Sequence, residues 1–580
     1  MTEQIASATG GPTSREAAQA LANLAAEAWE AVISRQPTFA TALGDRRFDD
    51  RLRPNAAGDL TREAAILEGL LDQARGVDPA PLSEAERVTR SALIDFLGYE
   101  LDLVASGIEA WTVDPLDGPQ VTFLNIPSFQ PVRTAAEAEA MLERWRAMGP
   151  SIDNLTITTR SALDRGVVSP QALVRSVVAE LDDLLGRPDD DWPLLDPARE
   201  ERPDWQAGTR SRFAHDLAAI VRNGIRPAFE RYRAFLADEV APRASSDDRP
   251  GLGSVPGGDG FYRHLVRAHT TLDLEPEAIH RIGLDETDRI DGEFEGLGRE
   301  LLGTADRAAV LTRLRSDPSL HFSTPGEVRA VAEASLARAN AATSNWFGRL
   351  PNAPCVVVEM GAHEAKHSTI AYYRQPAADG SRPGSYYINT TEPQTRPRYE
   401  AEVLAFHEAV PGHHLQIAIA QELEGLPAFR RLTGPTAFTE GWGLYSERLS
   451  AEMGLLSGSL DRFGILSFDA WRACRLVVDT GLHAMGWSRD RAIAFMVDHT
   501  ALAENNIANE VDRYLAMPGQ ALAYKLGQLE MLRLRDAARA ALGARFDIRS
   551  FHDIVLGQGA VALPTLGSVV HDWIEATGSD

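Results

Sequence analysis

The sequence predicts a mainly helical fold with a small antiparallel β-sheet. Segments rich in Ala, Leu, Glu and Arg repeat their apolar residues at helical spacing over most of the 580 residues, whereas β-branched and aromatic runs gather between residues 355 and 390. The composition, 44% hydrophobic and 24% charged, is that of a soluble globular protein. We therefore expect helices packed on helices, with one short interruption by strands.

The N-terminal part is predicted to be helical from residue 14 onward. REAAQALANLAAEAWEAVISR and TREAAILEGLLDQARG show the helical pattern most clearly. We expect a loop in WTVDPLDGPQVTFLNIPSF, which begins at Trp111, and a second break in LLGRPDDDWPLLDPAREERPDW. No linker divides the chain, so residues 1–580 are expected to form one unit, with a helical cover half at 14–350 and a functional half at 351–580.

The predicted sheet lies immediately before the most unusual stretch of the chain. CVVVEM, STIAYYRQP and GSYYINT are short β-branched or aromatic runs, and Gly, Pro and Asp separate them. Such runs are typical of short strands joined by turns. We expect a mainly antiparallel sheet.

The stretch FHEAVPGHHLQ, Phe406 to Gln416, places three of the chain's 14 histidines within eight residues. A zinc helix normally carries H-E-x-x-H, because residues four apart share a helix face and two imidazoles can converge on one ion. Here Pro411 stands four residues after His407, and proline disrupts a regular helix. A wide, π-like turn that loops out two residues would return His413 to the face of His407.

His414 is the alternative second histidine ligand. It lies seven residues after His407, on the same face of an undistorted helix but about 10.5 Å along its axis. The two imidazoles would then run parallel and would not converge. A third interpretation is a kinked core helix whose histidines bind carbonyl groups that the kink has freed.

A third ligand is expected from the next helix, GPTAFTEGWGLYSERLSAEMGLL, in which Glu440 stands near the start. Gly441 and Gly443 would permit close approach of that helix. Alone, Glu440 is an ordinary partner for a helix dipole. Together with His407 and His413 it completes the open three-ligand set of a catalytic zinc site, so we expect one Zn²⁺ per chain with a bound water.

HEAVPGHHLQ followed by FTEGWGLYSERL closely resembles the bacterial family known as domain of unknown function 885. The resemblance extends through PTFATALGDRRFDDRL, VPGGDGFYRHLVRAHTTLDLEPEAIHRIGLDE and YYRQPAADGSRPGSYYINT, so it covers most of the chain. That family is distantly similar to the helical zinc peptidases that include angiotensin-converting enzyme and thimet oligopeptidase. The resemblance implies a zincin-like peptidase fold.

Those peptidases carry H-E-x-G-H and a Glu on the next helix, so Gly412, His413 and Glu440 resemble their counterparts. The two inserted residues are the departure, and His414-Leu415-Gln416 can also be aligned with the His-x-Gln of the converting enzymes. An edge strand beside the metal helix pairs with substrate in those enzymes. The resemblance makes GSYYINT, with Tyr386 and Tyr387, the candidate substrate-binding strand.

Five polar residues on later apolar helices are candidates for stabilising the oxyanion of peptide hydrolysis, since His⁺, Arg or Tyr can donate to it. Arg513 and Lys525 are equally able to bind a substrate carboxylate. Tyr514 and Tyr524 stand on either side of a Pro518-Gly519 break that could turn both toward one cleft. The candidates are His483, Arg513, Tyr514, Tyr524 and Lys525.

The expected function is hydrolysis of short peptides by a zinc-activated water, with Glu408 as the general base. An amidase or isopeptidase would use the same site, and a metal-free binding or scaffold protein is the alternative outside enzymes. The substrate, the physiological metal and the oligomeric state stay open. The formal net charge of -25 argues against nucleic acid or an anionic membrane as a partner.

The N-terminal residues lack the basic region and the apolar segment of a signal peptide. No apolar run in the sequence reaches the roughly 18 residues of a membrane span. We therefore expect a cytoplasmic protein, although members of the resembled family are often exported or lipid-anchored and an exported mature form stays open. Cys355 and Cys474 lie far apart in apolar surroundings and are expected to be free thiols.

Overall fold

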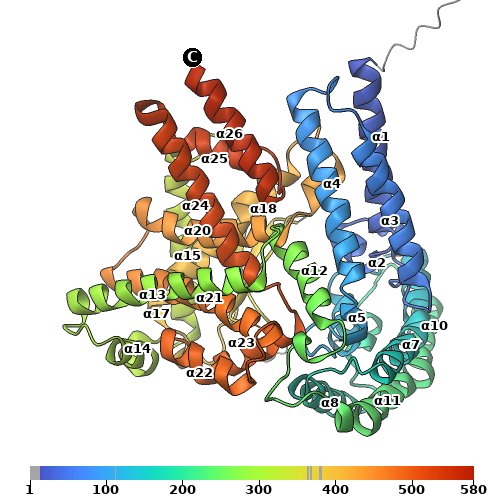
Figure 1. Ribbon diagram of the computed structural model, residues 1–580. Coiled ribbons are helices and arrows are strands. Elements are labelled where there is room, and N and C mark those ends of the chain that lie inside the picture. The colour runs from blue at the N-terminus through green and yellow to red at the C-terminus, as the bar shows by residue number, and fades with distance from the viewer. Residues whose placement is uncertain are drawn as a thin grey trace, which may run out of the picture.

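The computed structural model describes residues 13–111, 113–361, 365, 369–377, 380 and 382–579. Helices account for most of these residues, which confirms the mainly helical prediction. In Figure 1 the helices α1, α3 and α4 stand on the right, the helices α24, α25 and α26 stand on the left, and α12 lies between the two groups.

The helices before the sheet are α1 Ser14–Ile33, α2 Pro37–Leu43, α3 Asp59–Gly76, α4 Glu84–Ala105, α5 Ile108–Trp111, α6 Pro119–Asn125, α7 Ala135–Asp164, α8 Gln171–Leu185, α9 Asp196–Arg199, α10 Ala207–Ile220, α11 Arg226–Phe235, α12 Gly258–Thr270, α13 Pro276–Leu301, α14 Arg307–Ser316 and α15 Pro325–Ala342. The strands are β1 Cys355–Glu359, β2 Ala371–Arg374 and β3 Gly384–Ile388. The helices after the sheet are α17 Arg398–Glu408, α18 His413–Gln421, α19 Ala428–Leu432, α20 Thr436–Glu452, α21 Arg462–His483, α22 Arg489–His499, α23 Glu504–Ala516, α24 Leu522–Leu542, α25 Ile548–Leu556 and α26 Leu563–Ser579.

Local signals explain where several long helices begin. In α1 the hydroxyl of Thr13 accepts the backbone N–H of Glu16, and the Glu16 carboxylate accepts the backbone N–H of Thr13. This reciprocal capping satisfies donors that the first helical turn leaves free. The same Ser/Thr-x-x-Glu arrangement begins α4, α7 and α15.

The hydrophobic core crosses the predicted boundary between the two halves. Leu21 and Leu93 of the N-terminal helices share one buried cluster with Trp442 of α20 and Val570 of α26. In addition, α13 and α15 pack on α21 and α17. These helices from the predicted cover half therefore help to fix the position of the helices that carry the histidine cluster.

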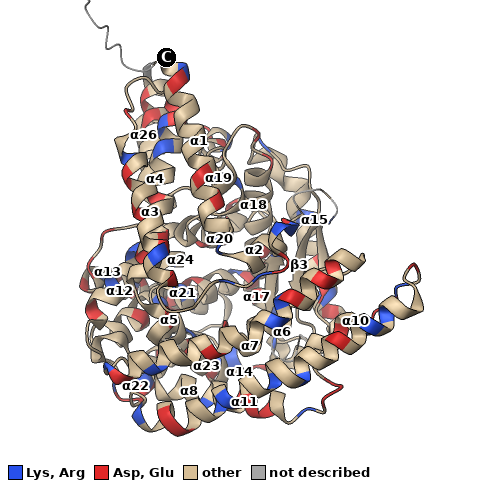
Figure 2. Cartoon of the chain, turned by 90° about the vertical axis from the view of Figure 1, so that its right-hand side faces the viewer, with Lys and Arg blue, Asp and Glu red and all other residues tan. Residues whose placement is uncertain are grey.

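A separate buried cluster lies within residues 113–240 and contains Trp145, Trp192 and Phe229. The loop predicted after Trp111 is only partly correct, because its second half folds into α6. Figure 2 views the molecule from the side on which α7, α10 and α11 lie, and it shows acidic and basic residues interspersed along these helices.

The sheet is mixed, and the prediction of an antiparallel sheet is wrong for one of its two strand pairs. The strand order is β1-β3-β2, with β3 antiparallel to β2 and parallel to β1. The strand β3 is therefore central, and both of its edges are already paired. Among the described helices, none is long and apolar enough to cross a membrane.

Candidate metal centre

The histidine stretch folds as two helices separated by a tight turn. Helix α17 ends at Glu408, residues 409–412 form the turn, and α18 begins at His413. The prediction of one bulged helix is therefore wrong in its local path, although one hydrogen bond of π-helical spacing spans the turn, from the His414 N–H to the Ala409 carbonyl at 3.0 Å. The Val410–Pro411 peptide bond is cis.

Two contacts hold this turn against its surroundings. A Cβ atom at position 412 would lie 1.9 Å from the carbonyl oxygen of His407, so only glycine fits there. The indole N–H of Trp442 donates to the Pro411 carbonyl at 2.9 Å. Because Trp442 lies on α20, this bond links the turn to the helix that carries Glu440.

The turn brings together the three residues predicted as metal ligands. His407, His413 and Glu440 each offer one ligand atom, and these atoms lie within 4.8 Å of one another. The Glu440 Oε2 atom is 3.6 Å from His407 Nε2 and 3.4 Å from His413 Nε2. The two imidazole rings meet nearly edge to face, with 4.7 Å between their centroids. The three side chains therefore converge on one point.

Glu447 orients the His407 ring from the opposite side. Its Oε1 atom lies 2.7 Å from His407 Nδ1 in a buried contact, which directs Nε2 toward Glu440. Outer carboxylates of this kind fix the tautomer of a metal-binding histidine. Gly443 makes room for the ring, since a Cβ there would lie 2.7 Å from His407 Cε1.

Glu447 was not among the residues predicted from the sequence. The available signal was its position seven residues after Glu440, which places both carboxylates on one face of α20. Arg472 was missed as well: it is almost completely buried, and its Nη2 lies 3.8 Å from the Glu447 carboxylate.

Close packing of glycines fixes the position of Glu440. Helices α20 and α24 approach so closely that a Cβ at Gly441 would lie 2.5 Å from the Gly527 Cα. The small residues beside Trp442 therefore permit close helix approach, as predicted. The partner helix α24 also carries Tyr524.

The imidazoles and the carboxylate of the cluster shift each other's ionisation. Burial alone would lower the pKa of His407, but Glu440 and Glu447 outweigh it and raise that pKa to about 9. Burial would raise the pKa of Glu440, whereas the two histidines hold it well below its usual range. Without a cation between them, these groups therefore satisfy one another as ion pairs.

His414 points away from the cluster. Its Nε2–H donates to the Ala353 carbonyl at 3.0 Å, and its Nδ1 accepts the Tyr373 hydroxyl at 3.0 Å. Burial lowers the pKa of His414 to about 4, so the ring is neutral at pH 7. Both ring nitrogens are occupied, and the structure favours His413 as the second histidine of the cluster.

Three of the predicted oxyanion donors are occupied by buried hydrogen bonds. The Tyr514 hydroxyl donates to Glu510 and accepts from Trp471 and Arg475. His483 donates to the Tyr514 carbonyl and accepts the Leu252 N–H. The fully buried Lys525 ammonium contacts Asp469, Gln528 and Glu286 at 2.6 to 2.9 Å. Tyr514, His483 and Lys525 are therefore assigned to the core and not to substrate contacts.

Of the five predicted donors, Tyr524 is the one that neighbours Glu440 of the cluster. Burial raises its pKa, and the charge of the neighbouring Glu440 raises it further. The guanidinium of Arg475 lies 4.4 Å from the centre of its ring. Arg513 is partly exposed, contacts Glu510 at 3.4 Å and donates to Gln520. Only Tyr524 is thus placed beside the ligand cluster.

The predicted role of GSYYINT as an edge strand is wrong. Because β3 lies between β1 and β2, its backbone groups are paired on both sides and cannot bind an extended peptide. Tyr386 is 1% exposed, and the half-buried Tyr387 stacks on Tyr372 with 4.7 Å between ring centroids. The Tyr386 side chain instead lines a cavity.

Comparison with known proteins identifies a family and several similar solved structures, two of which are described here. A family model described as "Bacterial protein of unknown function (DUF885)" matches residues 37–570. A crystal structure described as that of "the putative lipoprotein from Colwellia psychrerythraea" is 26% identical, has a TM-score of 0.89, and the match covers 97% of this chain and 99% of that one. A structure described as that of "a putative lipoprotein of unknown function from Shewanella oneidensis" is 17% identical and has a TM-score of 0.70, and the match covers 96% of this chain and 99% of that one. No protein with a curated description matches the chain.

Proposed function

The chain belongs to the bacterial DUF885 family, whose function is unknown, and we propose that it is a zinc-dependent peptidase that cleaves short peptides with a metal-activated water. The convergence of His407, His413 and Glu440 within 4.8 Å carries this proposal. No residue outside the cluster is needed to complete a three-ligand set.

The donor set fits zinc. Two imidazole nitrogens and one carboxylate oxygen are the ligands of many catalytic zinc sites, which keep a fourth position open for water. His407 presents Nε2 because Glu447 occupies its Nδ1. When bound, Zn²⁺ would polarise the substrate carbonyl and lower the pKa of the water.

Glu408 is placed to act as the general base. It is half-buried at the end of α17, directly after His407, and among the described residues its carboxylate makes no hydrogen bond or ion pair. A free carboxylate at this position can accept a proton from the attacking water and pass it to the leaving amine. The other carboxylates of the centre, Glu440 and Glu447, are both engaged with His407.

Tyr524 is the proposed oxyanion donor, and Tyr524→Phe is expected to lower kcat about 10² to 10³-fold, the usual cost of one such donor. Metal content should not change, because a phenol on α24 is not a ligand. Tyr514→Phe is the matched control: it removes a buried hydroxyl from the core, so it should reduce thermal stability and leave kcat unchanged. Steady-state kinetics and thermal melts of both variants test this. Equal kcat values for Tyr524→Phe and the wild type would remove Tyr524 from the mechanism.

An amidase or isopeptidase acting on a non-peptide amide is the alternative that the same geometry supports. A panel of short peptides, isopeptides and simple amides separates the two, because only a peptidase prefers the peptides. Hydrolysis should stop when a chelator removes the metal and return with Zn²⁺, Co²⁺ or Mn²⁺, since N/O sites accept these ions. Chelator-resistant hydrolysis would reject a metal mechanism. Failure to hydrolyse any of these substrates in the presence of zinc would favour a binding or scaffold role.

The cellular location stays a prediction. The first twelve residues, on which the expectation of a cytoplasmic protein depends, lie outside the described part of the chain. The relative from Colwellia psychrerythraea is described as a "putative lipoprotein", which favours the alternative of an exported form for this chain.

A further inference from the structure

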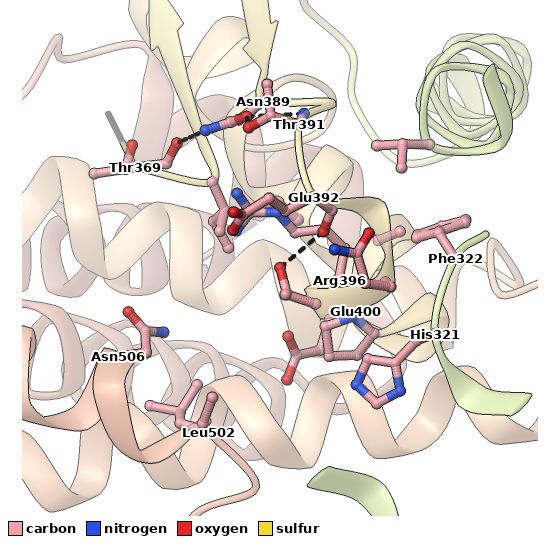
Figure 3. A pocket seen from close by; sticks show the side chains of 18 of the residues that line it. His321, Phe322, Thr369, Asn389, Thr391, Glu392, Arg396, Glu400, Leu502 and Asn506 are labelled. Atoms are coloured by element: carbon pink, nitrogen blue, oxygen red, sulfur yellow. Dashed lines mark hydrogen bonds between the residues drawn. The ribbon is translucent and has the colours of Figure 1, made fainter. Parts of the chain in front are cut away.

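A cavity of about 970 Å³ is lined in part by α17, the helix that carries His407 and ends at Glu408. Its walls include residues of α14, α15, β3, α17, α21 and α23 and of the segments before α17 and α23. Figure 3 shows Arg396, Glu392 and Glu400 in the middle of this cavity, with Asn506 and Leu502 on one side and Phe322 on the other. A space of this size is large enough for a small ligand or a few residues of peptide.

One wall of the cavity runs along α17 toward the proposed base. Glu400 and Leu404 line the cavity, and Glu408 is the next residue at the same helical spacing of four. Tyr386 lines the cavity too, and its pKa is raised by burial and then by the charge of Glu408. The wall along α17 therefore runs in the direction of Glu408, which follows Leu404 by about one helical turn.

A second part of the cavity wall, on α21, is connected to Tyr524 through Arg475. Trp471 lines the cavity, and the guanidinium of Arg475 lies 4.5 Å from the centre of its indole ring. The same guanidinium lies 4.4 Å from the centre of the Tyr524 ring. The cavity wall is therefore connected to Glu408 along α17 and to Tyr524 through Arg475.

Arg396 is the distinctive charged group of this cavity. Among the described residues its guanidinium forms no hydrogen bond or ion pair, and its Nε atom is buried without a partner. Arg315 also lines the cavity, but unlike that of Arg396 its guanidinium is occupied, because it donates to the carbonyls of Val497, Thr500 and Leu502. A planar cation with free donors in a pocket is suited to bind a carboxylate.

The acidic side chains of the cavity do not cancel this charge. Glu400 accepts the Ser467 hydroxyl at 2.6 Å, and burial raises its pKa to about 7, so it is only partly ionised at neutral pH. Glu392 is exposed. Burial lowers the pKa of Arg396, and the charges of Glu392 and Glu400 offset part of that effect. The guanidinium keeps its charge and its unused donors.

We propose that this cavity binds the part of the substrate on one side of the scissile bond, and that Arg396 pairs with a carboxylate of that part. The inference rests on the proposed peptidase function for the identity of the ligand as a peptide. From Glu400 to Glu408 the helix rises about 12 Å, which roughly four extended residues span. The carboxylate, whether C-terminal or of an acidic side chain, therefore lies about four residues from the cleaved bond.

Three matched peptide series test the proposal: one with a free C-terminus and no acidic side chain, one with a C-terminal amide and one Asp or Glu at varied positions, and one amidated peptide without acids. The wild type should prefer whichever series places a carboxylate about four residues from the cleaved bond. Arg396→Gln should raise KM for that series about 10- to 100-fold, the value of a charge-assisted hydrogen bond, and leave the uncharged series unchanged. A preference for the first series identifies the C-terminus, and a preference for the second identifies a side chain.

Arg398→Gln is the matched control, because Arg398 stands two residues further on and is paired with Glu327. It should not change the preference for a carboxylate. Calorimetric binding of the same peptides to Arg396→Gln and to the wild type tests the cavity even where hydrolysis fails, so failure of the peptidase proposal is distinguishable. Equal binding of acidic and uncharged peptides by the wild type, or an equal loss for all three series in Arg396→Gln, would overturn the proposal.

Discussion

Replacing Glu408 by glutamine is expected to lower kcat by about 10² to 10⁴-fold while the protein keeps its zinc. Glutamine has nearly the same shape as glutamate but cannot accept the proton of the attacking water. Because the Glu408 carboxylate makes no hydrogen bond or ion pair among the described residues, its replacement should leave the fold and the ligand cluster unchanged. The loss should therefore appear in kcat and in kcat/KM alike.

Metal content and thermal melting of the Glu408→Gln variant are the necessary controls. Zinc content equal to that of the wild type would assign the loss to proton transfer and not to a damaged site. A fully active Glu408→Gln variant would show that another residue is the general base. The mechanism drawn from the resemblance to zinc peptidases would then be wrong in its proton-transfer step.

Replacing His413 by alanine is expected to weaken zinc binding by more than the 10- to 100-fold that loss of an outer partner usually costs. His413 contributes one of the three converging atoms, whereas His414 is bound to Tyr373 and Ala353 on the side of the sheet. His414→Ala should therefore reduce stability, because it leaves the partly buried Ala353 carbonyl and the Tyr373 hydroxyl without this partner, and should keep most of the metal affinity. Competition with a chromophoric chelator measures both affinities.

The reverse order of the two affinities would show that the metal selects a different path for residues 409–412. Thermal melts of both variants are needed beside the affinities. A His413→Ala variant that folds normally and binds zinc as the wild type does would exclude the cluster as the metal centre.

Residue types and spacing were enough to predict which residues would converge, but not how the chain would turn between them. The histidines, Glu440 and the flanking glycines are recognisable in the sequence, since metal sites need such residue types close together. The break of the helix into α17 and α18 depends on distant contacts, such as the bond from Trp442 to Pro411. No local pattern contains that information.

The sheet shows the same limit of prediction from the sequence. Short β-branched and aromatic runs predicted three strands, yet strand order depends on which of these segments pair, and β1 pairs with β3, which is not the next strand in the chain. Parallel pairing of β1 with β3 places GSYYINT in the centre, and this position removed its predicted role as an edge strand.

Polar residues on apolar helices were the hardest to assign. Tyr514 and Tyr524 are equivalent in the sequence pattern, but only the structure shows that Glu510, Trp471 and Arg475 surround the Tyr514 hydroxyl while Glu440 neighbours Tyr524. Arg396 carried no signal, because the sequence contains many arginines and only the structure distinguishes those without a partner.

We propose that His407, His413 and Glu440 hold a catalytic zinc ion, and elemental analysis of the purified protein is a direct test of this claim. Protein prepared without added zinc should contain about one zinc per chain, as three protein ligands and a water imply, and Glu440→Ala should lose it. Absence of stoichiometric metal from the wild type, even after reconstitution with zinc, would contradict the claim.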